Sequence, residues 1–144
     1  MNIASAAAGE SLGWMGLVVA GALVVAFIVN IVSFGNRDMN QKSSIATSLM
    51  LIAFLLETAS WTVRSFRGGT ANGVFVTIVL CAVLHVVSGS ICLGAVWEFR
   101  TIGRWPYGHR RATLGFWLNV IALVVLAAWF YLATSEKLYN RLFN

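Results

Sequence analysis

Charged residues are scarce along this chain. Of its 144 residues, 10% are Asp, Glu, Lys or Arg and 59% are hydrophobic, whereas soluble domains carry about 25% charged residues. There is one proline, and there are only two cysteines and two histidines. This composition excludes an ordinary soluble domain and a disordered chain, and it predicts a membrane protein with several spans.

The few cysteines carry no recognisable chemistry. Cys81 and Cys92 lie in one apolar run, where a helix would separate them by about 16 Å of rise, too far for a disulfide. The chain also lacks ligand-spaced cysteine pairs, a hydrolase nucleophile elbow and a phosphate-binding glycine loop. We therefore expect no metal site and no catalysis by this chain alone.

What the chain does have is four long apolar runs between short polar segments. A helix needs roughly 20 apolar residues to cross the hydrocarbon of a bilayer. Residues 1–11 contain no Lys or Arg and no cleavage site is evident after the first run, so we expect a retained helix and not a signal peptide. The pattern predicts an all-α, polytopic membrane protein: one domain over residues 1–144, a bundle of four transmembrane helices at 12–34, 44–66, 74–99 and 112–134.

The basic residues lie at the ends of these runs and not in one stripe, so we expect membrane anchoring and no nucleic acid. Six of them fall in the first and third loops, namely Arg37, Lys42, Arg100, Arg104, Arg110 and Arg111. Four fall on the opposite side, namely Arg64, Arg67, Lys137 and Arg141. The positive-inside rule then predicts both termini outside. The membrane that we expect is a bacterial cytoplasmic membrane.

Two ionisable side chains are expected deep in the bilayer. Glu57 lies near the middle of the second run and His85 near the middle of the third. Antiparallel neighbouring helices bring these positions to similar depth, where an isolated charge is costly. We predict a buried polar pair of Glu57 and His85. It either fixes the register of the helices or serves proton or quinone chemistry.

Small side chains mark the faces expected to pack. Spaced by four residues in a helix, they let a neighbouring backbone approach closely in lipid. His85 shares one face with three small residues by i, i+3, i+4, i+7 spacing, so we expect its imidazole to face protein and not lipid. The predicted packing residues, which we expect to bury against partner helices, are Gly13, Gly16, Ala20, Ser88, Gly89, Cys92 and Gly94.

His85 also raises the question of a cofactor. A haem b inside one small subunit usually needs two axial histidines on facing helices, and His109 falls in the predicted loop 101–111. An internal haem is therefore disfavoured. One alternative stays open, in which His85 ligates haem b or lines a quinone site at a boundary with a second subunit. The membrane anchors of succinate dehydrogenases use one histidine per subunit in this way.

Two segments carry a family resemblance. LHVVSGSICLGAVWEFR, residues 84–100, has a histidine-valine pair, then a glycine and an aliphatic stretch ending in a basic residue. GHRRATLGFWLNVIALVVLAAWFYL, residues 108–132, has an aromatic pair at Phe116 and Trp117. These segments resemble the last two helices of haem-copper oxidase subunit III, and Glu57 in FLLETASW is similar to that family's membrane glutamate. Leu118 and Ile121 stand where the family commonly has a histidine and an acidic residue.

The resemblance implies a non-catalytic subunit without a metal of its own, which packs against a catalytic subunit, holds lipids in a cleft and supports proton uptake. We therefore expect an integral accessory subunit of a respiratory or related electron-transfer complex, whose partners are other membrane subunits and lipids. The anchor with haem b or quinone at His85 is the alternative. A free-standing channel or transporter is disfavoured, because no broken helix or internal repeat is visible.

Overall fold

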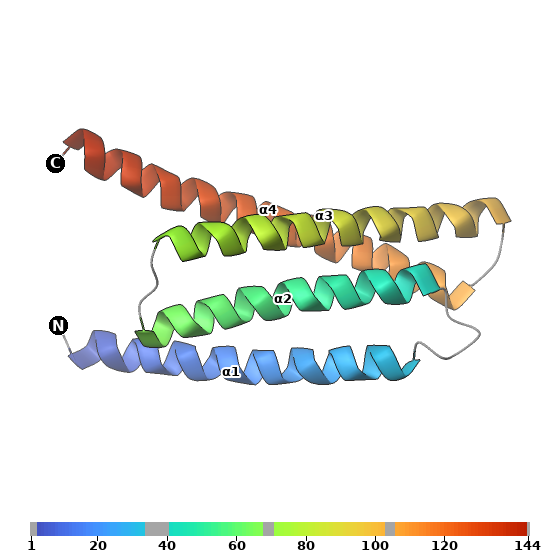
Figure 1. Ribbon diagram of the computed structural model, residues 1–144, viewed down its shortest axis with the longest axis horizontal. Coiled ribbons are helices and arrows are strands. Elements are labelled where there is room, and N and C mark those ends of the chain that lie inside the picture. Colours follow the sequence, from blue (N-terminus) through green and yellow to red (C-terminus); the bar gives the residue numbers. More distant parts are fainter. Residues whose placement is uncertain (1–2, 34–40, 68–70, 103–105, 144) are drawn as a thin grey trace.

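The computed structural model describes residues 3–33, 41–67, 71–102 and 106–143, with side chains for 11, 13–33, 41–63, 75–101, 109–131, 134 and 135. This part of the chain forms four helices (Figure 1): α1 (Ile3–Val32), α2 (Gln41–Arg67), α3 (Ala71–Ile102) and α4 (Pro106–Phe143). In a bilayer, a helix satisfies every backbone N–H and C=O within its own segment. The predicted all-α fold is confirmed.

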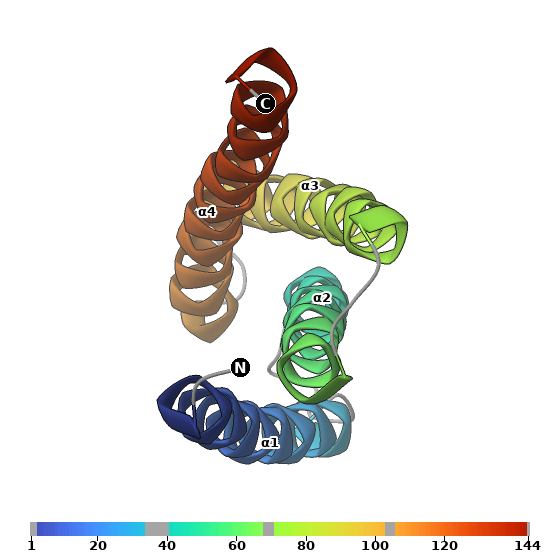
Figure 2. The ribbon, with the colours of Figure 1, turned by 90° about the vertical axis from the view of Figure 1, so that its left-hand side faces the viewer.

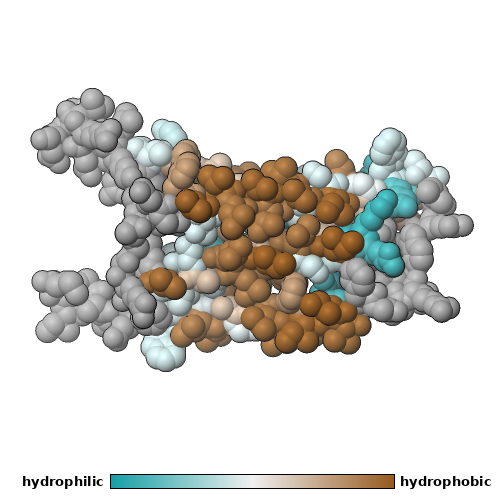
Figure 3. All heavy atoms as spheres, in the orientation of Figure 1, coloured by the Kyte–Doolittle hydropathy of each residue, from teal (hydrophilic) through white to brown (hydrophobic). Residues whose placement is uncertain are grey.

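Each helix contains a stretch long and apolar enough to cross a membrane. The stretches have 20 to 27 residues and are Gly13–Val32, Gln41–Val63, Phe75–Thr101 and His109–Tyr131. Apolar side chains cover the middle of the molecule, and hydrophilic ones gather toward the end where α2 begins (Figure 3). The prediction of four membrane-crossing helices is confirmed. Phe34, the predicted end of the first span, lies outside the described residues.

The four helices form an open row more than a closed bundle. α2 lies between α1 and α3, and α4 packs against α3 with a smaller contact to α2 (Figure 2). α1 packs mainly against α2. α1 begins and α4 ends at the same end of the molecule (Figure 1). α2 therefore contacts all three other helices and α3 lies between α2 and α4, whereas most of α1 faces outward.

α1 is attached to α2 at two places. Gly16 is buried against Thr62, and a β-carbon added at Gly16 would lie 3.3 Å from the Thr62 Cβ and closer still to its Oγ1. Near the other end of α1, the Asn30 Nδ2 donates to the Ser44 carbonyl at 3.0 Å and to the Ser48 Oγ at 2.8 Å. The Asn30 Nδ2 thus has two acceptors on α2, which an apolar neighbour could not offer, and these contacts fix how α1 lies on α2.

The connection before α4 is shorter than predicted. α3 continues to Ile102 and α4 begins at Pro106, a residue that suits the first helical position because its missing N–H would have no helical partner there. His109 therefore lies in the first turn of α4, and its assignment to a loop was wrong. Its ring stacks on Phe99, with the centroids 4.3 Å apart.

Candidate functional site

His85 is the centre of a polar network that joins three helices. Its side chain has no exposed surface. From α3, its Nε2 lies 3.0 Å from the Glu57 Oε1 of α2, and its Nδ1 lies 2.8 Å from the Asn119 Oδ1 of α4. The Phe54 ring packs edge-on against the imidazole at 5.0 Å. The structure thus brings the two predicted residues Glu57 and His85 into direct contact and adds a third partner.

Asn119 extends the network back to α2. Its Nδ2 donates to the Gly115 carbonyl at 2.7 Å and to the Ser88 Oγ at 3.0 Å. The Ser88 hydroxyl donates in turn to the Ala46 carbonyl at 2.7 Å. Asn119 and Ser88 are fully buried. A buried polar network is stabilising only when its members are satisfied, and every side-chain atom named here has a partner.

These partners determine where the hydrogen atoms lie. The Gly115 carbonyl can only accept, so the Asn119 nitrogen must face it and the Asn119 Oδ1 must face His85. That oxygen also only accepts, so the His85 Nδ1 carries a hydrogen. The contact between the His85 Nε2 and the Glu57 Oε1 then requires one proton, on one atom or the other.

The Glu57–His85 pair consequently has zero net charge in both of its forms. The pair is either a protonated imidazole with a carboxylate or a neutral imidazole with a carboxylic acid. Neither form leaves an uncompensated charge in the membrane interior, which would be costly there. The network therefore explains how two ionisable groups are tolerated within apolar helices.

The small residues on this face of α3 allow α4 to approach. Ser88, Gly89 and Cys92 are buried, and a β-carbon at Gly89 would lie 3.5 Å from the Asn119 Cβ. On the facing side, a β-carbon at Gly115 would lie 3.0 Å from the Cys92 Sγ, which is tighter than ordinary contact. These residues pack within the chain, and we had expected them to pack against partner helices.

The other predicted packing residues differ in how far they are buried within the chain. Gly13 is buried and Ala20 is half-buried on α1. Gly94 of α3 is exposed, and a β-carbon there would meet no atom within 4 Å. Among the seven predicted packing residues, Gly94 is therefore left with open space beside it by the described part of the chain.

Sequence analysis missed the two α4 residues that complete the site. Neither Asn119 nor Gly115 of the fourth run was assigned a role there. A usable signal was present, because an amide in the middle of an apolar run needs partners within the protein. Gly115 lies four residues earlier on the same helix face, and it supplies both the carbonyl for Asn119 and the space for Cys92.

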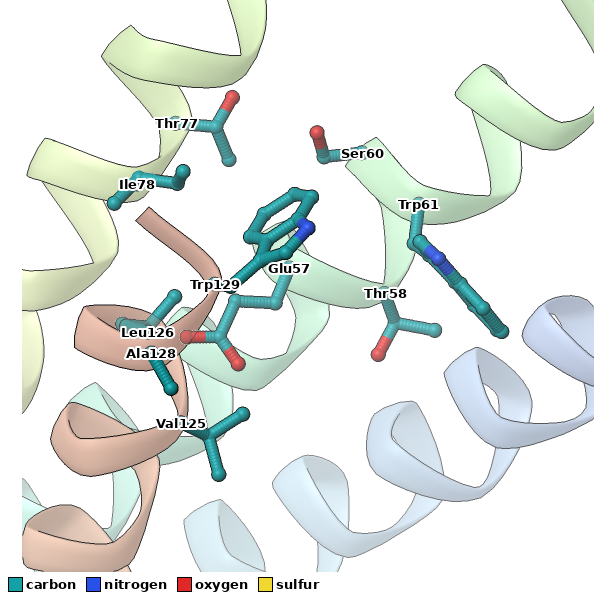
Figure 4. A pocket seen from close by; sticks show the side chains of 10 residues that line it. All are labelled: Glu57, Thr58, Ser60, Trp61, Thr77, Ile78, Val125, Leu126, Ala128 and Trp129. Atoms are coloured by element: carbon teal, nitrogen blue, oxygen red, sulfur yellow. The ribbon is translucent and has the colours of Figure 1, made fainter. Parts of the chain in front are cut away.

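Glu57 also faces a pocket between α2, α3 and α4 (Figure 4). Its side chain is 25% exposed, and its Oε2 has no hydrogen-bond partner in the described part of the chain. The pocket has a volume of about 540 Å³ and is lined by Glu57, Thr58, Ser60, Trp61, Thr77, Ile78, Val125, Leu126, Ala128 and Trp129. Glu57 is the one charged group among them.

A second groove lies between α3 and α4 and differs in chemistry. Its lining is entirely apolar and its volume is about 600 Å³; the lining residues are Phe75, Ile78, Val79, Ala82, Val83, Val86, Val87, Leu123, Leu126, Ala127 and Phe130. A groove without a polar group suits a hydrocarbon chain.

The end of the molecule where α2 begins is held by polar contacts. The Lys42 Nζ and the Glu98 Oε2 form an ion pair at 2.9 Å between α2 and α3. The Arg111 Nε donates to the Thr47 Oγ1 at 3.2 Å between α4 and α2. Of the other basic residues used to predict the topology, Arg100 and Arg110 have described side chains. Six lie outside the described side chains, namely Arg37, Arg64, Arg67, Arg104, Lys137 and Arg141.

The surroundings of His85 do not fit an axial haem ligand. Both ring nitrogens are engaged, and the side chain has no exposed surface toward which an iron atom could approach. Among the described residues, no three His, Cys, Asp or Glu side chains gather as metal ligands would.

Comparison with protein-family models, curated proteins and solved structures finds no match to this chain.

Proposed function

We propose that this protein is a non-catalytic integral subunit of a larger membrane complex, and that it acts through helix packing and lipid binding. The observation that carries the proposal is the network of Glu57, His85, Asn119 and Ser88. It connects α2, α3 and α4, and its two ionisable groups, Glu57 and His85, are hydrogen-bonded to each other. Such a network gives a membrane scaffold a defined register.

The outward surfaces support a role among other helices and lipids. Only 11% of the most apolar 18 residues of α1 are buried within the chain, and Gly94 offers a place where a foreign helix backbone can approach closely. The apolar groove between α3 and α4 fits an acyl chain. The resemblance to haem-copper oxidase subunit III suggests that the complex is a respiratory or related electron-transfer complex in a bacterial cytoplasmic membrane.

Purification of the tagged chain in native lipid, followed by mass spectrometry of co-eluting proteins, tests this proposal. We expect other integral membrane subunits to co-elute. Glu57→Leu and His85→Leu should each lower the yield of the intact complex more than they alter the spectrum of any cofactor it holds. A monodisperse, solitary chain, or an unchanged yield in both variants, would contradict the proposal.

The alternative, a redox anchor, depends on the same network. Haem ligation by His85 would require it to leave Glu57 or Asn119. The quinone form of the alternative is favoured by the pocket beside Glu57. A reduced-minus-oxidised spectrum of the native complex, compared with that of His85→Ala, separates the two functions: loss of a b-type signal only in the variant would support the anchor.

A further inference from the structure

We propose that the pocket beside Glu57 binds a lipophilic monovalent organic cation, in exchange for the proton that Glu57 shares with His85. Glu57 is the only charged residue among the pocket's lining side chains. All of its lining residues belong to the stretches of α2, α3 and α4 that are apolar enough to cross a membrane, so a ligand soluble in lipid can reach it. This binding site is independent of the accessory role proposed above.

The groups around the pocket suit a cationic ligand better than a neutral ligand that could only accept hydrogen bonds. One oxygen of Glu57 is held by His85, and the other is left to the pocket as a hydrogen-bond acceptor or anionic partner. Trp129 of α4 lines the same pocket, and Figure 4 shows its indole beside the Glu57 side chain of α2, whereas Trp61 is directed toward α1. Indole faces attract organic cations, most strongly away from water.

The exchange follows from charge balance. With its shared proton the pair has no net charge, so a cation beside Glu57 would leave one uncompensated positive charge in the apolar interior. Release of the proton to water restores neutrality. The other titratable groups near Glu57 give no alternative. Cys81 is a buried thiol bound to the Ala53 carbonyl, and the described side chains of α1 and the α4 lining contain no titratable group.

Proton loss also determines the movement of Glu57. The Asn119 Oδ1 keeps the hydrogen on the His85 Nδ1, so a deprotonated pair would set the Nε2 lone pair against the carboxylate. The carboxylate must then turn from His85 toward the pocket and its cation. Asn119 thereby acts as a positioning residue, because it prevents the imidazole from using its other tautomer.

Binding of benzyltrimethylammonium to the full chain in lipid nanodiscs tests the site, with (2,2-dimethylpropyl)benzene as its neutral isostere. Calorimetry in buffers of different ionisation enthalpy counts the protons. We expect the ammonium ion to bind, the isostere to bind at least about tenfold more weakly, and one proton to be released. The Kd of the ammonium ion should then fall about tenfold for each unit by which the pH is raised, over the range in which the free pair holds its proton.

Glu57→Gln is the decisive variant, because its amide can donate to a neutral His85 and so mimic the protonated pair. It should keep the thermal stability of the wild type and lose ammonium binding and proton release. Glu98→Gln, which removes an acid in a surface ion pair outside the pocket, is the matched control and should bind as the wild type does. Trp129→Phe should retain most of the affinity and Trp129→Leu should lose it.

Three results would overturn the proposal. Equal binding of the ammonium ion and its isostere would show an apolar groove without charge recognition. Binding without proton release in the wild type would contradict the exchange, and this measurement needs no variant. Displacement of the ammonium ion by a short-chain quinol that binds Glu57→Gln equally well would assign the pocket to a quinol.

Discussion

α1 and α3 look alike in the sequence and differ greatly in the structure. Both are long apolar helices with small residues at spacings of four. In α3, 28% of the most apolar 18 residues are buried, and the buried face holds His85, Ser88 and Cys92. In α1, 11% of the corresponding 18 residues are buried, and Asn30 is its one buried polar side chain among those described.

The difference shows what places a helix in a lipid environment. Apolar side chains gain little by leaving lipid for protein, since lipid tails are equally apolar. Polar side chains gain partners only inside the protein, so their number and depth decide how much of a helix is enclosed by its neighbours. α3 carries a histidine and a serine that bind the two flanking helices, whereas α1 has an amide that binds α2 alone.

The largest expected effect is at the centre of α3. His85→Leu removes both imidazole contacts and leaves the Asn119 Oδ1 and the Glu57 Oε1 without their partner. We expect a loss of unfolding free energy on the order of 2 to 3 kcal/mol. Thermal or denaturant unfolding in nanodiscs measures it. Val86→Leu, at an exposed neighbour, is the control, and equal stability of the two variants would refute the central role of His85.

A smaller effect is expected where α1 meets α2. In Gly16→Ala, the new β-carbon collides with Thr62, whose hydroxyl is already bound to the Thr58 carbonyl at 2.7 Å. Overpacking of this kind costs about 1 to 3 kcal/mol, and α1 should loosen from α2. Cysteine cross-linking between the two helices measures the change. Gly21→Ala has open space around the new methyl group and should cross-link as the wild type does.

Asn30 tests the polar attachment of α1. Asn30→Leu removes two hydrogen bonds to α2, each worth about 0.6 kcal/mol on average in a membrane. We expect a stability loss of about 1 kcal/mol, with faster hydrogen exchange confined to α1 and the start of α2. A loss as large as that of His85→Leu would mean that the two helices are equally central.

The smallest effect on the isolated chain is expected at Gly94. Because a methyl group there meets nothing within 4 Å, Gly94→Ala should change stability by less than about 0.5 kcal/mol. Gly94→Leu should nevertheless reduce the recovery of partner subunits if a foreign helix packs on this face. Gly115→Ala, with Cys92 3.0 Å from the new carbon, should destabilise the chain itself. Unchanged recovery of the complex in Gly94→Leu would place its contact surface elsewhere.

Much of the fold was predictable from sequence because a bilayer permits few structures. Long apolar runs must be helices with internally satisfied backbones, and their length sets the number of spans. The loop before α4 was predicted too long, because the polar and aromatic residues that follow Pro106 continue a helix as readily as they form a loop. Periodicity also correctly placed His85 on the face that it shares with Ser88 and Cys92.

By itself, the sequence determined four helices long and apolar enough to cross a membrane and the positions of Glu57 and His85 along them, because hydrophobicity and residue count suffice for both. Only the tertiary structure decided which partners these side chains have, that Asn119 is among them, and that Glu57 keeps one oxygen for a pocket. These outcomes depend on the rotation and spacing of one helix against another. Hydrogen bonds and single methyl-sized gaps set that geometry, and neither leaves a pattern along the chain.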